Sequence, residues 1–151
     1  MKKIEKILND KKYMEIVSKI LLHEEFQKRK KFEHHINRSV YDHSLYVSYY
    51  SYKIAKFLHL DIKSTAIGGL LHDFYDEPWL GVEVKKTKEK HGFVHAKKAL
   101  INAKKYFPEL MNKKVENIIL RHMFPLNITP PKYLESWIVT IVDKLSSIEI
   151  L

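Results

Sequence analysis

The chain has 151 residues, 45% of them hydrophobic, with four glycines and five prolines, which predicts one domain and favours helices over a turn-rich β-sandwich. It contains no cysteine, so disulfides and thiolate metal sites are excluded, and any metal must be held by His, Asp or Glu. Its formal net charge of +9 suits nucleic acid, lipid or a small polyanion and does not choose among them.

The N-terminal part is predicted as a helical segment over residues 1–38, preceding a core over 39–151. Charged residues interrupt its apolar residues too often for a signal peptide or a membrane span, so we expect a cytoplasmic protein with no membrane segment. Apolar spacing predicts a helix from Tyr13 to about Lys28. The basic clusters, including the KRKK run that contains Arg29, are interpreted as solvated faces.

The next helix is predicted to begin at a cap, Ser39 or Asp42, and to run to about Leu58. Its apolar residues step by three and four positions, which places them on one face. His43 lies at the start of that face and Phe57 at its end. This helix therefore offers an imidazole to the core.

A short helix follows over about residues 62–74. Gly68 and Gly69 lie within it and are expected to let another helix approach closely, because they have no Cβ. The helix ends on the pair His72 and Asp73, directly after an apolar run.

The charged stretch after Pro78 is predicted as the longest loop, either a solvated connector or a lid. A further helix is expected to begin near Phe93 and to stop at Pro108, because proline breaks helices. This helix carries His95.

The last two helices each carry a candidate ligand. One begins near Asn112 and bears His122 on its apolar face, and the other covers about residues 135–150 and bears Asp143. Residues 124–133 contain three prolines and cannot be helical throughout. We expect an all-α bundle of six to seven helices.

Imidazoles and carboxylates thus recur on the apolar faces of five predicted helices. A single histidine on such a face is more often a hydrogen-bonded core residue than a ligand. Several together change the interpretation, because burying them unpartnered costs free energy and because neutral His and ionised Asp are natural ligands of divalent cations. The predicted metal ligands are His43, His72, Asp73, His95, His122 and Asp143.

Two cations can share this set if Asp73 bridges them through its two oxygens. His43, His72 and Asp143 would complete one site, and the two later histidines would supply the other. Metals about 3.5–4 Å apart hold a hydroxide at neutral pH and clamp the oxygens of a phosphoryl group. The pattern therefore indicates phosphoryl chemistry.

The ordered pattern H…HD…H…H…D resembles the HD-domain superfamily of metal-dependent phosphohydrolases. Local contexts agree: VYDHSLYVS, GGLLHDF, VENIILRHM and IVTIVDKLSSIE, within residues 39–151. The resemblance implies a helical HD-domain bundle that hydrolyses a phosphoester or phosphoanhydride of a nucleotide or similar small metabolite. The full ligand set is most similar to small bacterial dinuclear proteins, including symmetrical dinucleoside-tetraphosphate hydrolases. It implies iron or manganese, with Mg, Ni, Co or Zn as alternatives.

Two features depart from the family pattern. Many relatives have Gly and Lys soon after HD, whereas this chain reads HDFYDEPW, so Asp76 or Glu77 either orients the attacking water or is a solvated helix-end acid. The third histidine is also ambiguous, because HGFVHA offers both His91 and His95. We prefer His95, since it opens a helix.

Several basic and aromatic residues are candidates for substrate contact. Arg38, Arg121 and Lys144 each lie close to a predicted ligand and are expected to bind phosphate, with surface ion pairs or solvation as the alternative. Four tyrosines crowd one helix, either stacking on a base or, as we favour, packing in the core: Tyr41, Tyr46, Tyr49 and Tyr50.

Two other functions compete with hydrolysis. A few HD-fold proteins with di-iron sites are oxygenases, which keeps the metals and changes the chemistry. The positive charge also suits a basic helical module that binds nucleic acid or a protein and has a structural or relict metal site. The expected assembly is a monomer or a homodimer.

Overall fold

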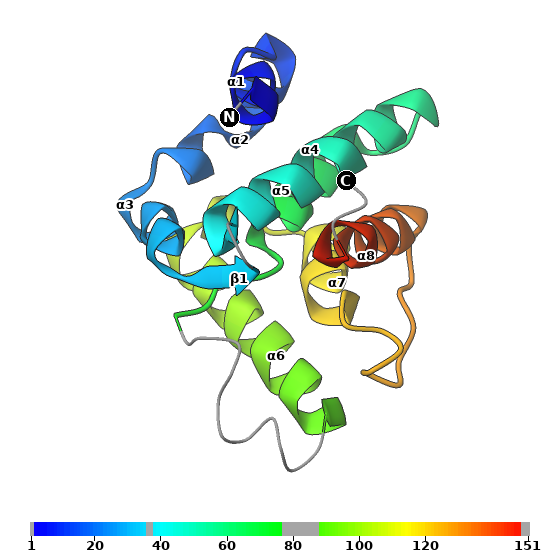
Figure 1. Ribbon diagram of the computed structural model, residues 1–151. Helices are drawn as coiled ribbons and strands as arrows, with labels where there is room; N and C mark the ends of the chain where they lie inside the picture. The colour runs from blue at the N-terminus through cyan, green and yellow to red at the C-terminus, as the bar shows by residue number, and fades with distance from the viewer. Residues whose placement is uncertain (1, 36–37, 77–87, 149–151) are drawn as a thin grey trace.

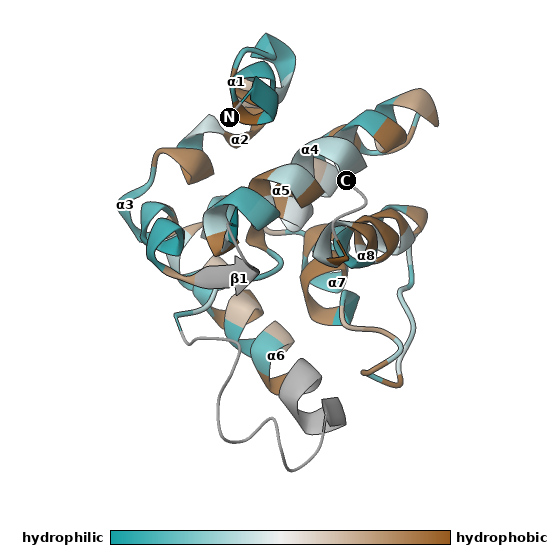
Figure 2. Ribbon diagram, in the orientation of Figure 1, coloured by the Kyte–Doolittle hydropathy of each residue, from teal (hydrophilic) through white to brown (hydrophobic). Residues whose placement is uncertain are grey.

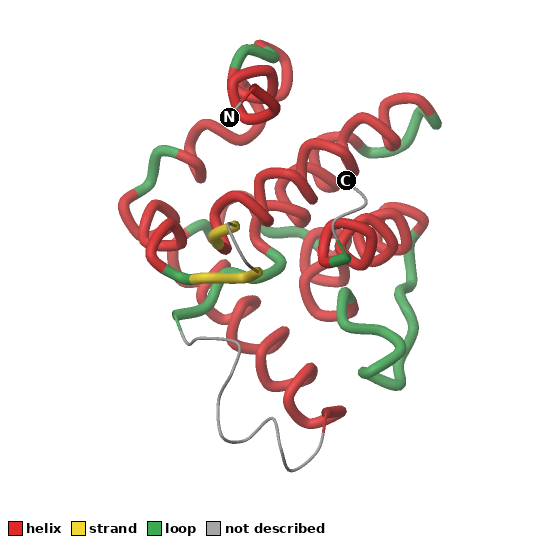
Figure 3. Tube along the Cα trace, in the orientation of Figure 1, coloured by secondary structure: helices red, strands yellow, loops and turns green. Residues whose placement is uncertain are grey.

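The structure, a computed structural model, describes residues 2–35, 38–76 and 88–148, and of residues 33–35 and 88–93 it describes the backbone alone. The predicted all-α class is confirmed, with eight α-helices in these ranges instead of six to seven (Figure 3). Within the same ranges, the β structure is one short antiparallel pair, β1 (Glu33–His35) with β2 (Arg38–Ser39).

The N-terminal segment consists of four short helical pieces: α1 (Lys2–Leu8), α2 (Lys11–Leu21), α3 (Glu24–Gln27) and the 3-10 helix η1 (Lys28–Lys31). The prediction of one helix from Tyr13 to Lys28 was wrong. The His23 ring accepts a hydrogen bond from the backbone N–H of Glu25 at 3.0 Å and so caps a new helix. The chain therefore turns here instead of continuing straight.

Helix α4 (Val40–Phe57) runs diagonally across the centre of the molecule in Figure 1. Ser39 is the N-cap, because its hydroxyl accepts from the Asp42 N–H, and Asp42, the alternative cap, lies within the helix, where its carboxylate accepts from the Ser39 N–H. Its apolar stripe leaves the core at the far end, since Phe57 is 76% exposed. The expected single buried face is thus shorter than predicted.

Helix α5 (Ile62–Leu71) packs directly against α4 and α7 (Lys113–Arg121), as its glycines predicted. A Cβ on Gly69 would lie 2.9 Å from the Cα of Ser48 in α4, and one on Gly68 would lie 2.7 Å from the side chain of Ile118 in α7. These positions admit no side chain without movement of a neighbouring helix. The close packing places the end of α5 between its neighbours.

The remaining elements are α6 (Lys88–Tyr106), the 3-10 helix η3 (Pro108–Leu110) and α8 (Leu134–Ser147). Helix α6 begins at Lys88 instead of Phe93, so part of the stretch predicted as loop is helical. Asn112 caps α7 by accepting from the Val115 N–H at 2.8 Å. Residues 124–133 are non-helical, as their prolines predicted.

The N-terminal helices share the main core with α4 to α7. Tyr13 of α2 donates to the Ser48 hydroxyl at 2.8 Å, and Ser48 donates to the Ala66 carbonyl at 2.6 Å, which links three helices inside the core. Figure 2 shows α1 as largely hydrophilic and α8 as largely hydrophobic. Across the described ranges, no helix is both long and apolar enough to cross a membrane.

Candidate metal centre

Five of the six predicted ligands come from helix ends or helix faces that point to one buried region. His43 lies in the first turns of α4, and His72 and Asp73 directly follow α5. His122 directly follows α7, and Asp143 lies on α8. All five side chains are buried.

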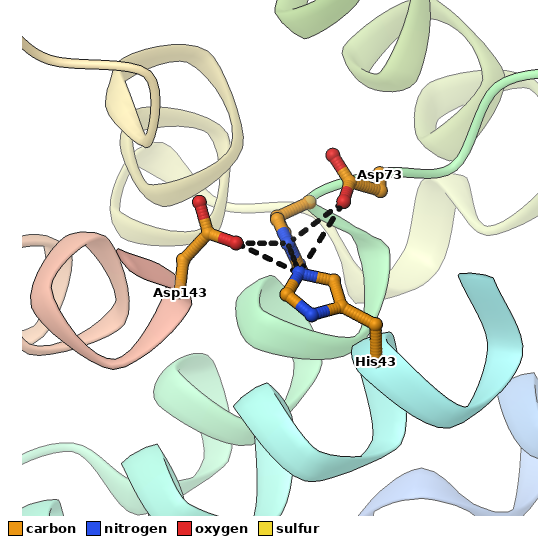
Figure 4. A group of neighbouring side chains, drawn as sticks. His43, Asp73 and Asp143 are labelled. Carbon is orange, nitrogen blue, oxygen red and sulfur yellow. Dashed lines mark hydrogen bonds and ion pairs between the residues drawn. The ribbon is translucent and has the colours of Figure 1, made fainter. Parts of the chain in front are cut away.

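Four of these residues form one compact group. One ligand atom from each of His43, His72, Asp73 and Asp143 lies within 4.8 Å of all the others. The Asp143 carboxylate lies 2.8 Å from His43 Nε2 and 3.2 Å from His72 Nε2. Figure 4 shows His43, Asp73 and Asp143 turned toward one point from separate parts of the chain. The group can hold a divalent cation.

The outer ring nitrogens of the histidines are held by fixed oxygens. His72 Nδ1 lies 2.6 Å from the Gly69 carbonyl and His122 Nδ1 lies 2.7 Å from the Ile119 carbonyl. A carbonyl only accepts, so both Nδ1 atoms carry the proton, and in the neutral ring each Nε2 presents a lone pair to the centre. This is the tautomer that a metal ligand needs.

His43 completes the same arrangement through a hydroxyl. Its Nδ1 lies 3.2 Å from the Ser146 Oγ, and its Nε2 lies 3.3 Å from the Nε2 of His72. A hydroxyl can accept a hydrogen bond, so Ser146 can take the Nδ1–H of a neutral His43 ring, whose Nε2 lone pair then faces the centre. The donor set therefore fits a cation.

The two carboxylates strengthen that fit. Burial lowers the pKa of His72, but Asp73 and Asp143 outweigh burial and raise this pKa well above its usual value. Burial likewise raises the pKa of each carboxyl, but His72 together with His122 beside Asp73, and with His43 beside Asp143, outweighs burial and holds both pKa values well below the usual range. Both carboxylates are thus anions in a buried site, and a divalent cation neutralises their combined charge.

Asp73 faces two ways. Its Oδ2 lies 3.1 Å from His72 Nε2 and 3.6 Å from His43 Nε2, whereas its Oδ1 lies 3.4 Å from His122 Nε2. One oxygen therefore belongs to the four-residue group and the other faces His122, which follows α7. The bridging role of Asp73 stays a prediction, with which this orientation agrees.

The family model described as HD domain matches residues 40–148. The chain belongs to the HD-domain family. This family consists in general of metal-dependent phosphohydrolases, and the buried His/Asp group is consistent with its metal site. Neither a curated protein nor a solved structure matches the chain.

The third histidine of the HD pattern is less closely placed. His95 is buried in α6 with its ring centroid 4.5 Å from that of Tyr75, and it is outside the four-residue group. Its ligand role stays a prediction. The alternative, His91, and the candidate Glu77 fall among the side chains that the structure does not describe.

Two predicted phosphate ligands lie beside the HD site. Arg38 donates to the carbonyl and the hydroxyl of Ser146, both at 3.1 Å, and its guanidinium lies 4.4 Å from the ring centre of Tyr46. Lys144 lies within 3.5 Å of the His122 carbonyl. Both are therefore near metal-ligand candidates, and their contact with phosphate stays a prediction.

The other two candidates are placed differently. The Asp76 carboxylate accepts a hydrogen bond from Arg29, so it has a protein partner besides its predicted role with water. Arg29 is 0% exposed, so the interpretation of its basic run as solvated is wrong for Arg29, although the three lysines of the run are exposed. Arg121 is half-buried at the end of α7, and its role stays a prediction.

The tyrosines of α4 mostly belong to the protein interior. Tyr41, Tyr46 and Tyr49 are buried, whereas Tyr50 is half-buried. This agrees with the favoured interpretation of core packing.

Sequence reasoning missed Ser146, which contacts both His43 and Arg38. Ser146 follows Asp143 by three residues, so both lie on one face of α8. A search of that helix face for residues able to accept from a ligand histidine would have found it.

Proposed function

We propose that the protein is a metal-dependent phosphohydrolase that cleaves a phosphoester or phosphoanhydride of a nucleotide or similar small phosphorylated metabolite. The convergence of four buried donors from α4, α5 and α8 supports this proposal most directly. A divalent cation held there supplies charge stabilisation for phosphoryl oxygens and an activated water near neutral pH. The protein residues orient the reactants and exclude bulk water.

The proposed first site uses four ligands: His43, His72, Asp73 and Asp143. The second site uses the other oxygen of Asp73, together with His122 and His95. The 3.4 Å separation between Asp73 Oδ1 and His122 Nε2 supports this division. Imidazole with carboxylate suits iron or manganese, with Mg, Ni, Co or Zn as alternatives.

The proposed substrate contacts come from basic residues around this site. Arg38 is the best supported, because Tyr46 and Ser146 hold its guanidinium close to His43. Arg121 and Lys144 would neutralise further phosphate oxygens. A symmetrical dinucleoside tetraphosphate is one candidate substrate. The protein itself is proposed to be a cytoplasmic monomer or homodimer.

The proposal is tested by metal analysis and a phosphate-release screen. The purified protein, loaded with Mn²⁺ or Fe²⁺, is assayed against mononucleotides, cyclic nucleotides and dinucleoside polyphosphates. We expect turnover of at least one class, lost in His72→Ala and Asp73→Ala. His59→Asn is the matched control, because His59 is an exposed histidine with φ 58°, a conformation that Asn tolerates. Activity that persists in both site variants would remove the proposal.

A further inference from the structure

A buried arginine from the N-terminal segment reaches the turn that follows the HD motif. Arg29 lies in η1, outside residues 40–148 that match the family. Its guanidinium lies 4.8 Å from the ring centre of Phe32 and 5.5 Å from that of Phe74. It donates to the carbonyl of Tyr75 and to the carboxylate of Asp76.

These contacts hold the backbone immediately after Asp73. The carbonyl of Phe74 accepts from the Asn102 side chain of α6 at 3.0 Å, so two successive carbonyls are held by distant side chains. The Tyr75 N–H in turn donates to the Asp73 carbonyl at 2.9 Å. The turn is thus fixed from the N-terminal segment on one side and from α6 on the other.

Stability alone is a poor explanation for this arginine. A buried guanidinium loses its hydration, and among the described residues Arg29 Nε has no hydrogen-bond partner. An apolar residue of similar volume would commonly serve a core equally well or better. What arginine adds is a rigid fork with two directed bonds, and both bonds end within three residues of Asp73.

We propose that Arg29 is a positioning residue that fixes the turn after Asp73 and thereby aims the two Asp73 oxygens. The inference rests on the proposed function, because it assumes that the cluster binds divalent cations. The Asp73 oxygens lie 3.1 Å from His72 Nε2 and 3.4 Å from His122 Nε2. A released turn lets the carboxylate tilt away from one of these partners. The N-terminal segment therefore controls metal affinity without contacting the metal.

The inference is tested by calorimetric titration of the 151-residue protein with Mn²⁺ and no other ligand, which measures the affinity for Mn²⁺. Arg29→Met removes the fork, and Arg29→Lys keeps the charge without the two directed bonds. We expect both variants to bind Mn²⁺ about 10- to 100-fold more weakly, the size typical of residues that orient metal ligands. Val17→Ala is the control, because Val17 is buried in α2 and its truncation destabilises the same N-terminal segment. It should keep wild-type affinity.

Two further variants separate positioning from loss of stability. Asn102→Ala removes the other bond to the turn and should also weaken Mn²⁺ binding, which keeps the inference testable if Arg29 variants do not fold. Ile101→Ala is its control, because Ile101 is the exposed neighbour of Asn102 on α6, and this variant should bind Mn²⁺ within about threefold of wild type.

The outcomes distinguish this inference from the proposed function. Wild-type protein that binds no Mn²⁺ at the cluster defeats both. Wild-type binding with equal affinity in folded Arg29→Met and Arg29→Lys overturns the positioning role and leaves the hydrolase proposal standing. Equal weakening in Val17→Ala also overturns it, because the effect would then follow stability. If the Arg29 variants do not fold, undiminished binding in Asn102→Ala overturns it.

Discussion

Two of the site histidines are oriented in the same way, by a hydrogen bond to a carbonyl of the preceding helix. His72 and His122 each occupy the position directly after a helix, and each directs Nδ1 to the carbonyl three residues earlier. The last carbonyls of a helix lack a partner within the helix, so the imidazole satisfies one of them. The same bond orients the ring and leaves Nε2 for the centre. The end of each helix thus orients a candidate metal ligand.

Ser146 should affect metal binding through His43, the histidine that it contacts. Ser146→Ala removes the hydroxyl that lies 3.2 Å from His43 Nδ1 and 3.1 Å from Arg38 Nη1. We expect metal affinity to fall about 10- to 100-fold, as for other groups that orient a ligand histidine. Calorimetric Mn²⁺ titration measures this, with Ser147→Ala as the control. Equal affinities in the two variants would contradict the role of Ser146.

At the scale of elements, the position of α5 depends on its glycines. Gly69→Ala places a methyl group 2.9 Å from the Ser48 Cα, which forces α5 away from α4 and carries His72 with it. We expect a loss of about 1–3 kcal/mol in the free energy of unfolding, the usual size for overpacking, together with weaker metal binding. Urea unfolding measures the first effect, and a variant as stable as wild type would contradict the packing argument.

A charged cluster joins the starts of α5 and α8 to α7. Glu135 is buried and accepts from Lys114 and from the Asp61 N–H, both at 3.0 Å. Burial raises the pKa of Glu135, but these donors outweigh it and lower the pKa below its ordinary value of 4.5. The ionised Glu135 therefore contributes stability above pH 4.5 that is lost as the pH falls through the lower folded value.

Glu135→Gln tests this sign. Wild-type stability should fall more between pH 7 and about pH 3.5 than that of the variant, whose side chain does not titrate. The comparison is made from urea midpoints at both pH values. Equal losses in the two proteins would show that the cluster does not contribute to acid sensitivity.

The whole molecule carries a positive excess that suits polyanions generally. If the protein is a hydrolase, its charge should aid capture of a phosphorylated substrate, and turnover should require metal. If it is a nucleic-acid-binding module, duplex affinity should fall about 10³- to 10⁵-fold between 50 and 200 mM salt for 6–10 phosphate contacts. Anisotropy with a labelled duplex, beside metal-dependent turnover, separates the two. Tight, salt-sensitive duplex binding without turnover would contradict the hydrolase account.

The parts of this molecule that were predictable from sequence depend on local signals. Ser39 and Asn112 mark helix starts because each side chain caps a backbone N–H only three residues further along the chain. The ligand types were visible on apolar faces, although their convergence required the fold. Arg29 was misinterpreted because its partners lie 46 and 47 positions away. The break at His23 was missed because a local cap competes with a continuing helical pattern.

The most direct test of the metal centre is anomalous diffraction from crystals of the protein soaked in Mn²⁺. We expect one peak bounded by His43, His72, Asp73 and Asp143, and a second peak on the His122 side of Asp73. Asp73→Asn crystals, treated in the same way, should lose the second peak. A wild-type map with no anomalous density inside the four-residue cluster would contradict the account.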